Sequence, residues 1–124
     1  MALADITLND GQGTPVAHTF TYVTMQGSKV IRRDFAAAPE TPLQMTHGHQ
    51  TATKGGVGVD SHLLRIDVTT LDSDGITPYI SNIRIMSDVP RPILSDALAD
   101  NLAAYVRNWA TSANIRAWLR GSVG

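Results

Sequence analysis

The sequence predicts an α+β fold in which an antiparallel β-meander sheet with an N-terminal hairpin precedes two C-terminal α-helices. Up to residue 89, apolar and polar residues alternate in segments separated by turn residues, and beyond it the apolar residues recur with helical spacing. The breaks between the longest segments, GGVG and DSDG, are short and contain glycine, as β-hairpins require. The corner VPRP separates the two periodicities, because proline is excluded from central strands and tolerated at a helix start.

The elements follow one another along a single predicted domain of 124 residues. Residues 1–26 predict the N-terminal hairpin, with ALADITL and VAHTFTYVTM flanking the loop NDGQGTP. Residues 28–89 predict the sheet, with strands in GSKVIRRDF, LQMTHGHQTATK, SHLLRIDVTTL and ITPYISNIRIMSDV. Residues 92–121 predict the helices, the second of them capped by Ser112.

Composition and charge exclude several classes of function for this protein. With 43% hydrophobic and 17% charged residues, the chain has the composition of a folded protein. Its net charge of −1 creates no global field that attracts nucleic acid, so any anion-binding surface must be local. The absence of cysteine excludes disulfides and thiolate catalysis. No secretory signal and no apolar run of membrane-spanning length stand out, so we expect no membrane partner.

The two tight turns predict a register in which Gly48 lies opposite Arg65 and Arg65 lies opposite Asn82. Because side chains alternate along a strand, this register sorts the sheet into two faces. The apolar face comprises Leu43, Met45, His47, His49, His62, Leu64, Ile66, Val68, Ile83 and Ile85. The polar face comprises Gln44, Thr46, Gly48, Gln50, Leu63, Arg65, Asp67, Thr69, Ile80, Asn82 and Arg84.

The helical segment is too small to cover the apolar face. A sheet of about five strands spans roughly 24 Å, whereas a helix of about 17 residues is roughly 25 Å long and 10 Å wide. Soluble monomers rarely expose such an apolar patch, so we expect an interlocked two-fold dimer. The predicted dimer interface is the apolar stripe of the helices: Leu94, Leu98, Leu102, Tyr105, Trp109 and Trp118.

Two strand sequences within this order of elements, HLLRIDV at residues 62–68 and NIRIMSDVP at residues 82–90, carry a family resemblance. The chain resembles the coat proteins of single-stranded RNA bacteriophages, the levivirus group, over nearly its whole length. The resemblance implies coat homodimers that assemble in the cytoplasm of a host bacterium into an icosahedral capsid around genomic RNA. It also implies that some dimers bind an RNA hairpin and repress replicase translation.

In that family, alternate residues on the inner face of the central strands contact RNA. Together with the register, the resemblance predicts an RNA-binding set on the polar face: Gln44, Thr46, Gln50, Arg65, Asp67, Asn82 and Arg84. Arginine pairs with phosphate, whereas asparagine and glutamine read exposed bases. Leu63 departs from the family pattern, which has a polar contact residue there. Without the resemblance, the same residues read as a solvated sheet face with an Arg65–Asp67 contact.

Three histidines support an alternative function. His47 and His49 share a face, and the predicted register places His62 diagonally opposite His49. Such a cluster suits zinc when a carboxylate completes it, yet no carboxylate lies nearby on that face, which favours packed or interfacial histidines and no metal. The alternative is a small dimeric α+β domain that binds a ligand or metal through these histidines; a tail or tube subunit is a third possibility.

A basic cluster and the absence of catalytic motifs also bear on the function. The basic residues Lys29, Arg32 and Arg33 either extend the RNA surface or guard a strand edge. No Gly-x-Ser-x-Gly motif occurs and no cysteine nucleophile is possible, so neither an enzymatic activity nor a cofactor is predicted.

Overall fold

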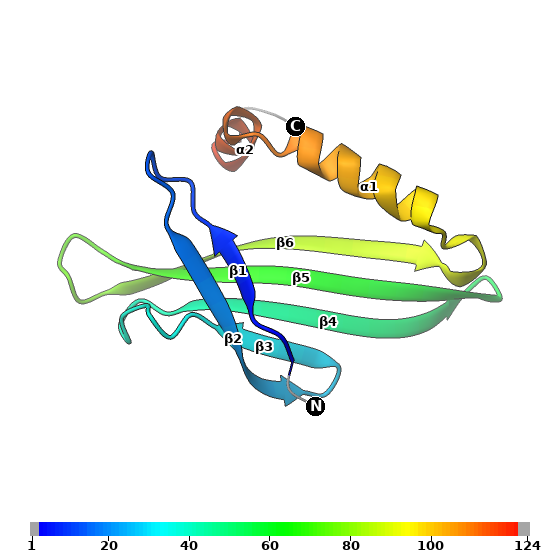
Figure 1. Cartoon of the computed structure of the whole chain (residues 1–124), viewed down its shortest axis with the longest axis horizontal. Coiled ribbons are helices and arrows are strands. Elements are labelled where there is room, and N and C mark those ends of the chain that lie inside the picture. The colour runs from blue at the N-terminus through cyan, green and yellow to red at the C-terminus, as the bar shows by residue number, and fades with distance from the viewer. Residues whose placement is uncertain (1–2, 122–124) are drawn as a thin grey trace. The chain divides into compact units, whose positions relative to one another are not determined.

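The computed structural model describes residues 3–121 as six β-strands and two α-helices. The strands are β1 (Ile6–Asn9), β2 (Ala17–Gln26), β3 (Lys29–Arg33), β4 (Leu43–Lys54), β5 (Val57–Leu71) and β6 (Pro78–Pro90) (Figure 1). A 3-10 turn (Arg91–Ile93) precedes α1 (Asp96–Trp109) and α2 (Ser112–Leu119). The chain divides after Asp88 into two compact units, one with nearly all of the sheet and one with the helices.

The six strands are hydrogen-bonded to one another in chain order, β1 to β6. The predicted fold class, an antiparallel meander with an N-terminal hairpin followed by two C-terminal helices, is therefore confirmed. The sheet has six strands rather than about five, because β2 joins the hairpin to the meander. The interlocked dimer stays a prediction.

The N-terminal hairpin folds over the meander because β2 changes its partner. Residues 17–20 of β2 pair with β1, whereas residues 21–26 pair with β3. The second ladder shifts register between Tyr22 and Thr24, a β-bulge of the kind that bends a strand and increases its twist. The hairpin consequently lies across the other strands of the sheet instead of extending their plane (Figure 1).

The buried core is small. Among the described residues, the buried apolar side chains are Phe20 of the hairpin, Met45 of β4 and Val59 of β5. Arg32 is also buried and lies opposite Met45 in the ladder, on the apolar face. Its Nε donates to the carbonyl oxygen of Ala4 at 3.2 Å, which ties the chain before β1 to β3. Few apolar residues are thus removed from water within this unit.

The predicted β4–β5 register is wrong by two residues. The structure pairs Thr46 with Arg65 and Gly48 with Leu63, and the ladder closes at a two-residue turn of Gly55 and Gly56. Both glycines have positive φ, at 59° and 80°, the backbone that a type I′ hairpin turn demands and that Val57 would adopt only with strain. Because the error is an even number of residues, the division into apolar and polar faces is unchanged.

The turn between β5 and β6 is displaced in the opposite direction: its centre lies one residue later in the chain than predicted, whereas that of the β4–β5 turn lies one residue earlier. The amide of Asp72 donates to the carbonyl oxygen of Thr77 at 2.8 Å, enclosing a four-residue loop of residues 73–76. Within it, the carboxylate of Asp74 accepts bonds from the amides of Ile76 and Thr77, and Gly75 has a φ of 71°. The side chain of Ser61 also bonds Asp88, which fits a two-residue shift of the β5–β6 register.

The helical unit begins later than predicted. Pro92 lies in the 3-10 turn, Leu94 is extended, and α1 starts at Asp96 with Ser95 accepting the amide of Leu98 at 3.1 Å. Leu94 therefore lies outside α1 and is not on the helical stripe, because the helix begins only after its cap, Ser95. The predicted Ser112 cap is also wrong: Thr111 accepts the amide of Asn114, and Ser112 is the first residue of α2.

Candidate nucleic-acid interface

Three strands present the polar face in parallel rows. The ladder pairs place one residue of β3, one of β4 and one of β5 side by side in each row. Along the sheet the rows are Arg33–Gln44–Asp67, Ile31–Thr46–Arg65 and Lys29–Gly48–Leu63. Polar groups from strands that are distant in sequence therefore meet on one continuous surface.

Two arginines sit in a hollow of about 260 Å³, which we call the arginine hollow; it is lined by Arg33, Pro42, Gln44, Arg65, Asp67, Thr69 and Ile80. Arg65 Nε donates to Asp67 Oδ1 at 2.8 Å, and Arg33 Nη2 donates to Gln44 Oε1 at 3.2 Å. Their side chains are thus held in place by neighbours on the same face. A guanidinium carries five N–H donors, so a single bond leaves it able to bind an anion.

A second depression, the glycine hollow, has a volume of about 220 Å³ and is lined by Ser28, Lys29, Gly48, Gln50, Ser61, His62, Leu63 and Met86. Gly48 forms its floor: a Cβ there would lie 3.5 Å from Leu63 Cβ and 3.7 Å from Lys29 Cγ. The missing side chain leaves room above the sheet between an ammonium group and the amide of Gln50. The glycine hollow therefore presents charged, polar and apolar side chains to a ligand.

The structure brings the predicted RNA-binding residues together only in part. Gln44, Arg65 and Asp67 share the arginine hollow, and Gln50 lies in the glycine hollow. Thr46 is 7% exposed, so it offers little surface to a ligand. The remaining two, Asn82 and Arg84, lie exposed on β6. RNA contact by this set stays a prediction.

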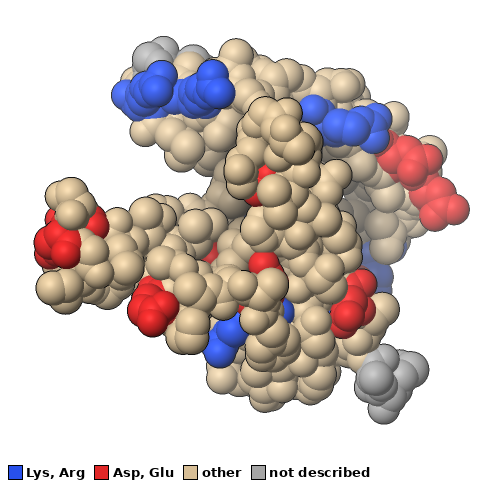
Figure 2. Space-filling model, turned by 60° about the vertical axis from the view of Figure 1, so that its left-hand side comes forward, with Lys and Arg blue, Asp and Glu red and all other residues tan. Residues whose placement is uncertain are grey.

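The basic cluster divides between the two faces. Lys29 and Arg33 pair with Gly48 and Gln44 on the polar face, whereas Arg32 is on the apolar face. Sequence reasoning named all three residues but did not place them, although strand alternation through residues 29–33 gives this division. Lys29 and Arg33 thereby join the candidate interface. On the face drawn in Figure 2, most of the surface is uncharged, and the basic and acidic groups form small patches, one basic patch lying directly beside an acidic one.

Large apolar side chains are exposed in both units. Leu102, Tyr105, Trp109 and Trp118, four members of the predicted interface stripe, have exposed fractions between 42% and 69%, and Leu98 is half-buried. The rings of Trp109 and Trp118 meet edge to face with centroids 6.0 Å apart. On the sheet, Val68, Ile83 and Ile85 of the apolar face are exposed as well. Soluble proteins rarely leave such surfaces uncovered.

Comparison with known proteins yields structural matches alone, since no protein-family model and no curated protein sequence matches the chain. A virus-like particle of bacteriophage NT-214 matches with a TM-score of 0.72 and 23% identity over 95% of both chains. A virus-like particle of Beihai levi-like virus 21 matches with a TM-score of 0.71 and 14% identity, covering 100% of this chain and 98% of that one. The bacteriophage EMS014 coat protein matches with a TM-score of 0.67 and 16% identity, covering 90% and 79%.

The chain has the fold of levi-like phage coat proteins. The likeness extends over almost all elements of the meander and both helices, so the expected resemblance in fold is confirmed. Within the described residues, none of the helices of this coat-protein fold is both long and apolar enough to cross a membrane.

The three histidines do not form one cluster on this coat-protein fold. His49 and His62 are directly opposite in the ladder rather than diagonal, with their Nδ1 atoms 2.7 Å apart. His47 instead places Nδ1 3.1 Å from Nη1 of Arg32. Between residues 3 and 121, no group of three or more His, Cys, Asp or Glu side chains is arranged to hold a metal ion. The geometry therefore gives the alternative metal-binding function no support.

The environment of His47 favours its neutral form. Partial burial, the Arg32 guanidinium and His49 all lower the pKa of His47 below its ordinary value of 6.5. Since Arg32 can only donate, Nδ1 of His47 must accept the bond and carry no proton. Protonation would place two cations in contact beneath the hairpin.

Replacing His47 with glutamine tests this assignment through the pH dependence of stability. Below about pH 6.5 an unfolded histidine gains a proton that folded His47 resists, so the stabilisation due to neutral His47 is lost as pH falls. We expect the free-energy difference between wild type and His47→Gln, measured by urea unfolding, to shrink from about pH 7.5 to about pH 5. The matched control His62→Gln removes an exposed histidine; an equal slope for both variants would contradict the assignment.

Proposed function

We propose that the protein is the coat protein of a single-stranded RNA phage, which dimerises and assembles into an icosahedral capsid around the genome. The observation that carries this proposal is a fold shared over almost the whole chain with subunits of virus-like particles. The role is structural and not enzymatic. Assembly takes place in the cytoplasm of the host bacterium, and the protein resides in the virion capsid.

The assembling unit is a homodimer held together by apolar surface. Each copy exposes an aromatic stripe on its helices and apolar residues such as Ile83 and Ile85 on its sheet. Removing apolar area from water contributes roughly 25 cal/mol per Å², and two copies related by a two-fold axis can each offer a helix stripe and a sheet face. In such a dimer, the helix stripe and the apolar sheet face that a single chain exposes are covered.

Tyr105→Glu tests the dimer interface, because Tyr105 is 69% exposed and its replacement removes little packing within one chain. An aromatic anchor at an interface contributes about 2 kcal/mol or more, so the dimer should weaken by roughly 30-fold. Analytical ultracentrifugation measures the dissociation constant, and circular dichroism checks that the helices persist. Asn101→Glu places the same charge on another exposed position of α1. Equal dissociation constants for Tyr105→Glu and wild type would exclude this interface.

RNA binds to the polar face through many weak contacts. The arginine hollow offers two guanidinium groups to phosphate, and the glycine hollow offers Lys29, Gln50 and space for a base beside Leu63. One such face is a weak binder, yet a closed shell repeats it in every copy, and repetition raises the overall affinity. This suits a chain whose net charge is only −1. The same face binds an RNA hairpin when the dimer represses translation.

The double variant Arg65→Ala/Arg84→Ala tests the RNA surface. Losing two phosphate contacts should reduce the slope of log affinity against log salt by about two. Fluorescence anisotropy with a labelled single-stranded RNA measures that slope, and the 260-to-280 nm absorbance ratio of purified particles reports their RNA content. Arg107→Ala, an exposed arginine of α1, is the control. If the double variant binds RNA as tightly as the control at every salt concentration, these two arginines are not the contacts.

A further inference from the structure

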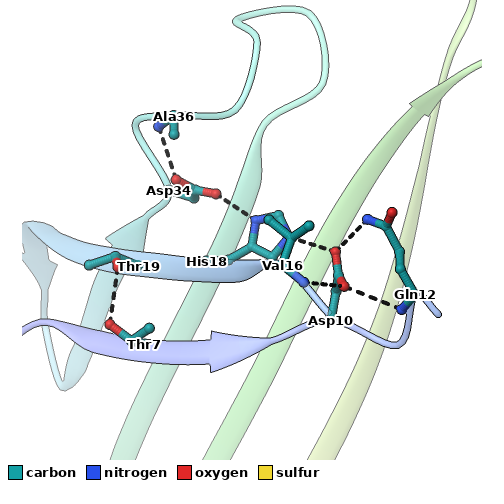
Figure 3. A network of polar contacts seen from close by, with 8 residues as sticks. All are labelled: Thr7, Asp10, Gln12, Val16, His18, Thr19, Asp34 and Ala36. Atoms are coloured by element: carbon teal, nitrogen blue, oxygen red, sulfur yellow. Dashed lines mark hydrogen bonds and ion pairs between the residues drawn. The ribbon is translucent and has the colours of Figure 1, made fainter. Parts of the chain in front are cut away.

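The imidazole of His18 lies between two carboxylates that come from different segments. Its Nε2 is 3.0 Å from Asp10 Oδ2, in the loop after β1, and its Nδ1 is 2.9 Å from Asp34 Oδ2, just after β3 (Figure 3). A carboxylate can only accept, so both ring nitrogens must donate, and a neutral imidazole has one donor. The geometry therefore requires the imidazolium form.

Both carboxylates are fixed by bonds of their own. Asp10 Oδ1 accepts the amide of Val16 at 3.0 Å and Oδ2 accepts the side chain of Gln12 at 2.6 Å, which closes the loop between β1 and β2. Asp34 Oδ1 accepts the amide of Ala36 at 2.9 Å, and Asp34 is only 5% exposed. Each acceptor is therefore held in place by bonds that do not depend on the proton of His18.

We propose that His18 is a proton-operated latch, whose positive charge holds the loop end of the β1–β2 hairpin on the sheet and whose deprotonation at alkaline pH releases that end. The opposite end of the hairpin is anchored separately, by buried Phe20 and by the bond from Arg32 to Ala4. Release is consequently confined to the loop end of the hairpin. The latch does not depend on the proposed coat function, because every group involved belongs to one chain.

The latch borders a depression of about 540 Å³, lined mainly by small and apolar residues such as Ala37, Leu43 and Val68. His18, Asp10 and Asp34 are the titratable residues among its lining, so no described lysine or arginine of the lining competes for the carboxylates. Opening the latch removes one wall of this groove. A change of one proton therefore alters an apolar surface next to the hairpin.

The pKa values of the three groups agree with this geometry. Bonds to Asp34 and then to Asp10 raise the pKa of His18 above its ordinary 6.5. The Val16 amide and His18 hold the pKa of Asp10 far below its usual value, and His18 lowers that of Asp34. The stabilisation from a raised histidine pKa is complete well below 6.5 and is lost as pH rises through the folded value. Because the pKa values of Asp10 and Asp34 are lowered, both carboxylates stay charged as the pH rises. The latch therefore opens when His18 loses its proton, at alkaline pH.

Hydrogen–deuterium exchange of the full-length protein, read by mass spectrometry, tests the latch. The readout is the exchange rate of residues 10–18 divided by that of β4 in the same sample, which cancels the general rise of exchange with pH. We expect this ratio to rise in one step as the pH is raised above about 6.5, the ordinary value for histidine. A ratio that stays constant from there to the pH at which the whole protein unfolds would overturn the proposal.

Variants identify the group responsible. Asp34→Asn and Asp10→Asn each remove one carboxylate and should move the step to lower pH, and either suffices if the other fails to fold. His18→Gln should abolish the step and leave the loop end open at every pH. Asp5→Asn removes an exposed carboxylate from the same hairpin and should leave the step unchanged. A step at the wild-type pH in both Asp34→Asn and Asp10→Asn would exclude His18 as its cause.

Discussion

The two-glycine turn between β4 and β5 is the constraint on which the arrangement of the sheet depends. Gly55 and Gly56 both adopt positive φ, and the ladder that starts there continues through twelve pairs to Leu43 and Val68. A register shift of one residue would exchange the two faces of β5 relative to those of β4. It would place Arg65 of the candidate interface on the same face as the core residue Met45. The separation of the apolar face from the polar face of the sheet follows from this turn.

A second constraint is the small size of the core. Three buried apolar residues in the described part of the chain remove little surface from water, whereas many large apolar residues are exposed. Many of the exposed residues are ordered: aromatic side chains recur on the helices, and Val68, Ile83 and Ile85 recur on the apolar face of the sheet. Ordered apolar surface is typical of subunits that complete their packing by association. A coat protein needs that property, and a soluble monomeric binding domain does not.

The sequence predicts the elements and the faces because both depend on local periodicity. It misplaces the register because GGVG offers two possible turn centres, and only the φ values of Gly55 and Gly56 select one. The burial of Arg32 and its bond to Ala4 depend on how the hairpin crosses the sheet, which a bulge near Tyr22 sets. The His18 latch was missed for the same reason, since three separated segments meet there and no spacing in the sequence indicates it.

The central claim is that apolar self-association builds a shell whose polar face holds RNA. Size-exclusion chromatography of the purified full-length protein, with absorbance recorded at 260 and 280 nm, tests it most directly. The account predicts a particle peak in the void volume with the absorbance ratio of nucleic acid, and closed shells of uniform size in electron micrographs of that peak. A single peak of discrete dimers with a protein-only ratio would contradict it.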